Sequence, residues 1–146
     1  MPSALFFVSD YYELRYQADR GILHGRARRG LSMDEFLEVC EQFLLLARQQ
    51  HCRYWLLDGR ADINRRDPSI YLWLNEDYLP RVREALGEGP CMAFLATPEQ
   101  WAQLGQRGYG PNAPARPASL SYTGWFTEEA QALSWLNKFR SPLPAA

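Results

Sequence analysis

From Leu31 onward the chain alternates short apolar runs with longer amphipathic segments, and this alternation restricts the fold more than any other feature. Continuously apolar runs at 53–58 and 91–95 are typical of strands that are buried on both faces of a sheet. Each run is followed by a segment whose apolar residues recur at helical spacing. Strands that alternate with helices predict parallel central strands joined by helical crossovers, so the pattern indicates an α/β fold.

Capping boxes mark where two of the helices begin. Ser32 is followed three residues later by Glu35, which predicts a helix from here to about Gln50. Thr97 and Gln100 repeat the motif and open a helix that Gly105 ends. The sequence therefore places these two helix starts firmly.

Two further helices are expected on other grounds. Asp67 and Pro68 supply an N-cap and a first-turn proline, and the stripe that follows extends to Leu86. Pro80 lies inside this stripe, which predicts a kink or a split into two pieces. The last helix is expected from Thr127 to about residue 140.

The first 30 residues are expected to form strands. Polar and apolar residues alternate over 11–17 and over 21–28, with a turn between them, which predicts a β-hairpin preceded by a strand near 5–9. Gly25 and Ala27 lie on the apolar face of the hairpin, so a helix can approach the sheet closely there. A last strand is expected at 119–126.

Together these elements predict a mixed sheet of about five or six strands, with an antiparallel N-terminal hairpin, a parallel centre and four helices. The length of 146 residues fits one domain, expected over 1–140, with 141–146 as a flexible tail.

Composition excludes several functional classes. The 16 basic and 17 acidic side chains leave a net charge of -1, which argues against a general nucleic-acid binder. No apolar run is long enough for membrane insertion or for the core of a signal peptide. The three cysteines Cys40, Cys52 and Cys91 lack a disulfide framework spacing and are expected to be reduced thiols. We therefore expect a cytoplasmic protein.

A candidate ligand site lies where the parallel strands end, because crevices form at the carboxyl ends of such strands. Asp58, Arg60, Arg65 and Arg66 fall in this segment and could bind a phosphate or carboxylate close to a helix start. The alternatives are a solvated loop whose charges pair with one another, and an Asp58 that binds the amides of the next loop. The Gly/Pro-rich segment 105–118 could cover a pocket or could be a mobile insertion.

Catalytic and cofactor signatures are not found in the sequence. The two histidines lie in no metal-ligand pattern, and the glycines at 105–110 follow a helix instead of opening one. We therefore expect no enzyme activity, no metal and no cofactor. Tyr71, Tyr78 and Trp101 are candidates for an exposed aromatic interface with a protein partner or with a second copy in a homodimer.

The order of elements resembles the STAS or SpoIIAA-like domains, known from bacterial anti-sigma-factor antagonists and from transporter regulatory tails. The sequence also resembles uncharacterised small bacterial proteins of this architecture. The resemblance implies a regulatory interaction domain whose serine, after an Asp at a helix start, is phosphorylated; Asp67 and Ser69 are the counterparts here. Pro68 stands between them and no glycine follows, so Ser69 can also be a plain helix-start serine. We expect a non-enzymatic interaction domain switched near Ser69, or alternatively a small-molecule binder or enzyme with a pocket under 105–118.

Overall fold

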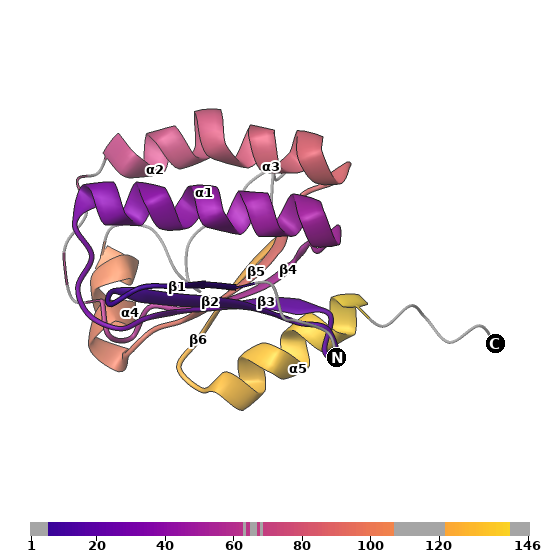
Figure 1. The fold of residues 1–146 in the computed structure, drawn as a ribbon. Coiled ribbons are helices and arrows are strands. Elements are labelled where there is room, and N and C mark those ends of the chain that lie inside the picture. The colour runs from indigo at the N-terminus through magenta and orange to yellow at the C-terminus, as the bar shows by residue number, and fades with distance from the viewer. Residues whose placement is uncertain (1–5, 63, 65–66, 68, 107–121, 141–146) are drawn as a thin grey trace.

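A computed structural model describes residues 6–62, 64, 67, 69–106 and 122–140, and these residues form a three-layer α/β structure (Figure 1). Its centre is a six-stranded sheet in which every strand lies beside the next one along the chain. The strands are β1 (Phe6–Val8), β2 (Tyr12–Gln17), β3 (Ile22–Ala27), β4 (Tyr54–Asp58), β5 (Cys91–Leu95) and β6 (Tyr122–Phe126). The first three pair antiparallel and the remaining pairs are parallel, which confirms the predicted α/β class with its hairpin and parallel centre.

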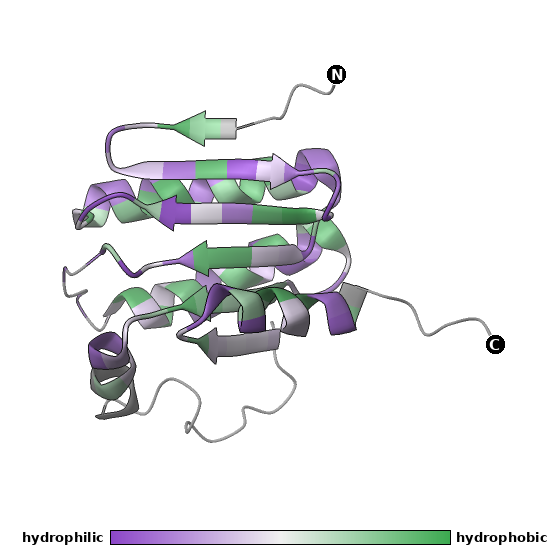
Figure 2. Ribbon diagram, turned by 90° about the horizontal axis from the view of Figure 1, so that it is seen from below, coloured by the Kyte–Doolittle hydropathy of each residue, from purple (hydrophilic) through white to green (hydrophobic). Residues whose placement is uncertain are grey.

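Helices cover the two faces of the sheet unequally. α1 and the α2–η1–α3 segment lie next to each other over one face, whereas α5 lies across the other face, against β4, β5 and β6 (Figures 1 and 2). The helices are α1 (Met33–Gln50), the consecutive segments α2 (Ser69–Trp73), η1 (Leu74–Tyr78) and α3 (Leu79–Leu86), then α4 (Pro98–Gln106) and α5 (Glu129–Arg140). In the described part of the chain, no helix has the length and apolar character needed to cross a membrane.

Both predicted capping boxes are present. The Ser32 hydroxyl accepts a hydrogen bond from the Glu35 amide at 3.1 Å, and the Glu35 carboxylate accepts one from the Ser32 amide at 2.9 Å. Thr97 and Gln100 exchange the same pair of bonds at 3.1 and 2.8 Å. These bonds satisfy helix amides that would otherwise lack partners, which explains why both helices begin where the sequence predicts.

Pro80 is accommodated by a change of helix type. The five residues of η1, which ends two residues before the proline, form a π-helical turn, and the Leu79 amide donates to the Leu74 carbonyl. Because proline has no amide hydrogen and its ring crowds the preceding turn, a local widening lets the helical segment continue. The sequence predicted a kink or a split at this proline, and the structure has a π-helical turn between α2 and α3.

The core is divided by the sheet into two clusters. The larger one packs α1 and α3 on the sheet and contains Phe43 and Trp55, whose rings stack at 5.0 Å. The smaller one lies under α5 and includes Leu56 and Leu136. Trp55 and Leu56 are neighbours on β4 and point to opposite faces, as strand alternation requires. All three cysteines are buried and free.

Candidate ligand-binding cavity

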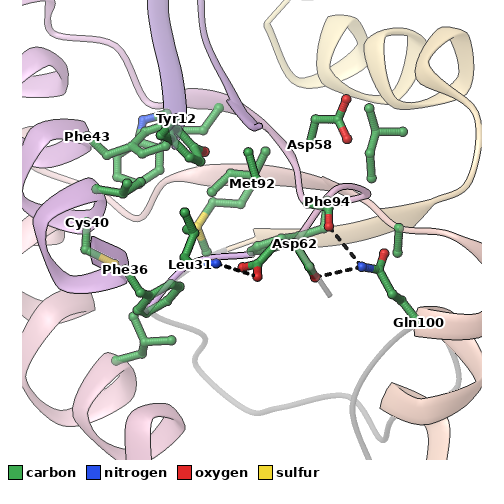
Figure 3. Close-up of a pocket in the computed structure, with 18 of the residues that line it drawn as sticks. Tyr12, Leu31, Phe36, Cys40, Phe43, Asp58, Asp62, Met92, Phe94 and Gln100 are labelled. Atoms are coloured by element: carbon green, nitrogen blue, oxygen red, sulfur yellow. Dashed lines mark hydrogen bonds between the residues drawn. The ribbon is translucent and has the colours of Figure 1, made fainter. Parts of the chain in front are cut away.

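A cavity of about 310 Å³, partly open to solvent, lies between α1, the α2–η1–α3 segment and the sheet (Figure 3). It is located where β4 and β5 end, at Gly59 and Ala96, which is the position expected for a ligand site in a sheet with parallel strands. Small-molecule sites are clefts of about 300–1,000 Å³, so this cavity is a candidate binding site.

Aromatic side chains dominate the lining of this cavity. They come from the hairpin, from α1, from three strands and from the helical segment before Pro80: Tyr12, Phe36, Phe43, Trp55, Tyr71, Tyr78, Phe94 and Trp125. Aliphatic side chains and Cys40 fill most of the remaining wall. Such a surface favours a molecule that is largely apolar.

Small residues on β3 create the room for this wall. A Cβ atom added to Gly25 would lie 2.5 Å from Cζ of Phe43 and would also overlap the Tyr12 hydroxyl. The predicted close approach of a helix at Gly25 is therefore confirmed, and α1 brings Phe43 down onto the sheet there. Ala27, opposite Tyr12 in the hairpin, lines the cavity directly.

The π-turn positions a second tyrosine over the cavity. The Tyr78 hydroxyl donates a short hydrogen bond to the carbonyl of Cys40 on α1. Burial raises the pKa of Tyr78, and the nearby Cys40 and Glu41 add to the effect. This bond ties η1 to α1 across the cavity wall.

Polar side chains hold together the loops at one end of the cavity. The Asp62 carboxylate accepts from the amides of Leu31 at 3.0 Å and Asn64 at 3.2 Å, and the Asn64 side-chain amide donates to the Leu31 carbonyl at 2.8 Å. Gln100 donates to the carbonyls of Gly59 at 2.9 Å and Asp62 at 3.0 Å. The loops that follow β3, β4 and β5 are thereby fixed relative to one another, as Figure 3 shows for Leu31, Asp62 and Gln100.

Asp58 is buried at the end of β4 with 4% of its surface exposed, and its carboxylate faces Arg60. It accepts from the Arg60 amide at 3.1 Å and from the guanidinium at 2.9 and 2.8 Å. Burial alone would raise the pKa of Asp58, but the hydrogen bonds from Arg60 outweigh it and lower that pKa. The structure thus shows the alternative in which Asp58 binds the next loop and pairs with an arginine.

The structure does not describe the other two arginines of the predicted anion site. Arg65 and Arg66 lie outside the described residues, as does most of the segment 105–118 and the tail 141–146. Ser69 is exposed at the start of α2, and its amide donates to the Asp67 carboxylate at 2.9 Å. A phosphate site built from Arg60, Arg65 and Arg66 stays a prediction.

The predicted aromatic interface needs correction. Tyr78 has 3% of its surface exposed because its ring lies in the core and its hydroxyl is bound to α1. Tyr71 is half-buried and lines the cavity, and Trp101 is half-buried on α4. Tyr78 therefore contributes to the wall of the cavity and is not part of an exposed surface.

The sequence predicted the region of the cavity but not most of its lining. Asp62, Asn64 and Gln100 lie in the predicted segments 58–69 and 97–100, where the parallel strands end, whereas Tyr12 and Phe43 were only part of apolar stripes. One signal was available, since two small residues on one face of the hairpin indicate space above the sheet. Which distant side chains border that space depends on the tertiary fold.

A second polar group lies on the opposite face of the sheet. His24 on β3 is half-buried there, and burial lowers its pKa, while Glu129 of α5 and Asp58 act in the other direction. Its Nε2 and Oε1 of Gln17 are buried without a hydrogen-bond partner in the described part of the chain. Among the described residues, no group of three or more His, Cys, Asp or Glu side chains is arranged to hold a metal ion.

The geometry of the cavity is the main evidence on what the protein can bind. Family models, curated proteins and solved structures give no match to this chain.

Proposed function

We propose that this protein binds a compact, largely apolar small molecule in the cavity between α1, the α2–η1–α3 segment and the sheet. The observation that carries the proposal is the aromatic lining of a cavity of about 310 Å³ at the carboxyl ends of β4 and β5. Ligand sites are clefts of about 300–1,000 Å³ with mostly apolar walls and few polar groups. An apolar cavity of about 150 Å³ holds one benzene molecule, so this one suits a molecule of about two fused rings.

The fixed loops at the end of the cavity support its role as a binding site and not as a packing defect. Asp62, Asn64 and Gln100 hold three loops by side-chain hydrogen bonds to backbone groups. A site that is formed before the ligand arrives loses less entropy on binding. The cavity is therefore well suited to bind an apolar molecule without a large rearrangement.

Titration with the neutral fluorophore N-phenylnaphthylamine tests the proposal, because its fluorescence rises in an apolar site. We expect saturable binding to the natural protein. Ala27→Leu places a larger side chain in the cavity and should weaken binding by at least about tenfold, since it takes up space that the ligand needs. Thermal unfolding of Ala27→Leu should show that the variant is folded.

Ala130→Leu is the matched control, because it makes the same change at an exposed position of α5. It should leave binding unchanged. Failure of the natural protein to bind the probe saturably, or equal weakening by both substitutions, would contradict the proposal.

A regulatory interaction domain, cytoplasmic and bound to a protein partner or a second copy, is a second proposal. It is supported by the exposed position of Ser69 beside Asp67, which is what phosphorylation at a helix start requires. Mass spectrometry of the protein purified from its own host tests it. A phosphate mapped to Ser69 supports the switch, and its absence under all growth conditions sampled would count against it.

A further inference from the structure

The hydroxyl group of Tyr12 is a polar group in a cavity whose wall is mostly apolar. Tyr12 lies on β2 with 4% of its surface exposed, and its ring packs edge-on against Phe43 at 6.2 Å. Figure 3 shows Tyr12 beside Phe43 and Met92, among the side chains that surround the cavity. The ring therefore belongs to the core, and the question is what its oxygen contacts.

The two buried tyrosines of the cavity differ in their hydrogen bonds. The Tyr78 hydroxyl donates to the Cys40 carbonyl, whereas the Tyr12 hydroxyl makes no hydrogen bond to any described residue. Among the described residues, two side-chain polar atoms are fully buried without a hydrogen-bond partner, namely Oε1 of Gln17 and Nε2 of His24. The Tyr12 hydroxyl is not among them, so its oxygen is not fully enclosed by protein. The hydroxyl of Tyr12 thus reaches the space of the cavity.

We expect a hydroxyl in this position to form a hydrogen bond with the ligand in the cavity. Buried polar groups in folded proteins are nearly always hydrogen-bonded, because a group that loses its hydrogen bonds to water and gains none in return destabilises the protein. Tyrosine can donate one hydrogen bond and accept others. Burial raises the pKa of Tyr12 well above its usual value, and nearby Cys40, Asp58 and Asp62 add to this, so the group is protonated and able to donate.

The charge of the cavity wall limits the ligand further. Asp62 is on this wall, whereas the carboxylate of Asp58, next to Leu57 on β4, faces Arg60 on the other side of the sheet. The described side chains of the wall include no lysine, arginine or histidine. A negatively charged ligand would lose its hydration on entry and find no opposite charge on these side chains. A carboxylate or sulfonate ligand is therefore disfavoured.

We infer that the ligand is an uncharged, ring-containing molecule whose carbonyl oxygen accepts a hydrogen bond from the Tyr12 hydroxyl. This inference rests on the proposed function, because it names the class of ligand for the same cavity. It goes further in that it assigns Tyr12 the role of selecting the ligand.

Three two-ring probes of similar shape separate the contribution of the carbonyl oxygen from that of the apolar rings and from that of a negative charge. Acetylnaphthalene carries a carbonyl group, isopropenylnaphthalene replaces its oxygen with a methylene group, and naphthoate carries a negative charge. Each displaces N-phenylnaphthylamine to the extent that it binds. We expect the ketone to bind about three- to tenfold more tightly than the alkene, which is the range for one hydrogen bond, and naphthoate to bind more weakly than both.

Tyr12→Phe removes only the hydroxyl oxygen and should abolish the preference for the ketone while the alkene still binds. Tyr122→Phe is the matched control, because Tyr122 is exposed on β6 and does not line the cavity, so the loss of its hydroxyl should leave the ratio unchanged. The comparison of ketone and alkene on the natural protein needs no variant, so it decides the matter even if Tyr12→Phe does not fold.

The outcomes distinguish this inference from the proposed function. If the ketone and the alkene bind equally to the natural protein, or if naphthoate binds best, the inference is wrong and the cavity is still a binding site. If none of the probes binds and N-phenylnaphthylamine does not bind either, the proposed function fails as well.

Discussion

Gly25 decides how closely α1 can approach the sheet. It pairs with Leu14 and Leu57 on its two neighbouring strands, and the Phe43 ring of α1 lies directly over it. Phe43 in turn stacks on Trp55, so the ring cannot move away without disturbing the larger core cluster. One missing side chain thus sets the position of a helix and of the cavity wall.

We predict that Gly25→Ala lowers the free energy of unfolding by about 1–3 kcal/mol, since an added methyl group overpacks the site. Urea denaturation monitored by tryptophan fluorescence measures the change. Gly59→Ala is the control, because the nearest atom to its added Cβ is the Leu95 carbonyl oxygen at 3.8 Å. It should change stability by at most about 0.5 kcal/mol. Equal losses from both substitutions would show that the close approach is not responsible.

At the level of elements, the position of each helix end depends on how the backbone groups there are hydrogen-bonded. α1 begins with a complete capping box, and Arg29 adds hydrogen bonds to the Glu35 carboxylate that lower its pKa to about 2. Its C-terminal end is less favourable, because His51 adopts a left-handed conformation with φ 50° and ψ 46°. Glycine is the usual residue in that conformation, since a side chain crowds the backbone there.

His51→Gly should therefore stabilise the protein by up to about 1 kcal/mol, as the strain of the left-handed residue is removed. The His51 side chain is exposed, so little packing is lost. Differential scanning calorimetry should show a higher Tm. Gln49→Gly, within the last turn of the same helix, should instead lower the Tm, because glycine is unfavourable inside a helix. A lower Tm for His51→Gly would contradict this account of the helix end.

For the whole molecule, the two faces of the sheet carry different chemistry. The face under α1 and α3 holds the larger core cluster and the cavity. The other face is only partly covered, since α5 lies against β4, β5 and β6, and charged residues of β2 and β3 form ion pairs there, such as Glu13 with Arg26 at 3.0 Å (Figure 2). His24 lies at the margin of this face, half-buried and with a lowered pKa.

The lowered pKa of His24 predicts how stability depends on pH. A histidine whose pKa is lower in the folded state than in the unfolded chain binds fewer protons when folded, so stability rises with pH through this range. Full stability is present above the unfolded value of about 6.5 and is lost as the pH falls below it toward the folded pKa. Most carboxylates titrate at lower pH and contribute little here.

Urea midpoints measured between about pH 7.5 and pH 5.5 should therefore decrease for the natural protein. His24→Gln should reduce this decrease, because the titrating group is gone. His51→Gln removes the other histidine, so the comparison of the two variants shows which histidine carries the pH dependence. A pH dependence that persists in His24→Gln would assign it to another group.

Local signals in the sequence were sufficient for the elements and the fold class. Ser32 with Glu35 and Thr97 with Gln100 mark helix starts because a capping box needs only residues three apart. The hairpin and the buried strands follow from periodicity, and their order predicts the mixed sheet. Gly25 was also correctly interpreted, since a small residue on an apolar face leaves space whatever lies opposite. The capping boxes and the periodicity of each element depend on residues that are near in sequence, which is why the sequence alone reveals them.

The position of the cavity could be predicted from the order of strands, but its lining was decided by tertiary structure. Tyr12, Phe43 and Trp125 are far apart along the chain and become neighbours of one space only when α1 packs on the sheet and β6 joins it. Tyr78 belongs to the apolar stripe that extends to Leu86 and was also a candidate for an exposed interface. It is buried, because the π-turn before Pro80 directs its hydroxyl to Cys40. A sequence pattern specifies which face of an element is apolar, but the space left between faces depends on how all the elements pack together.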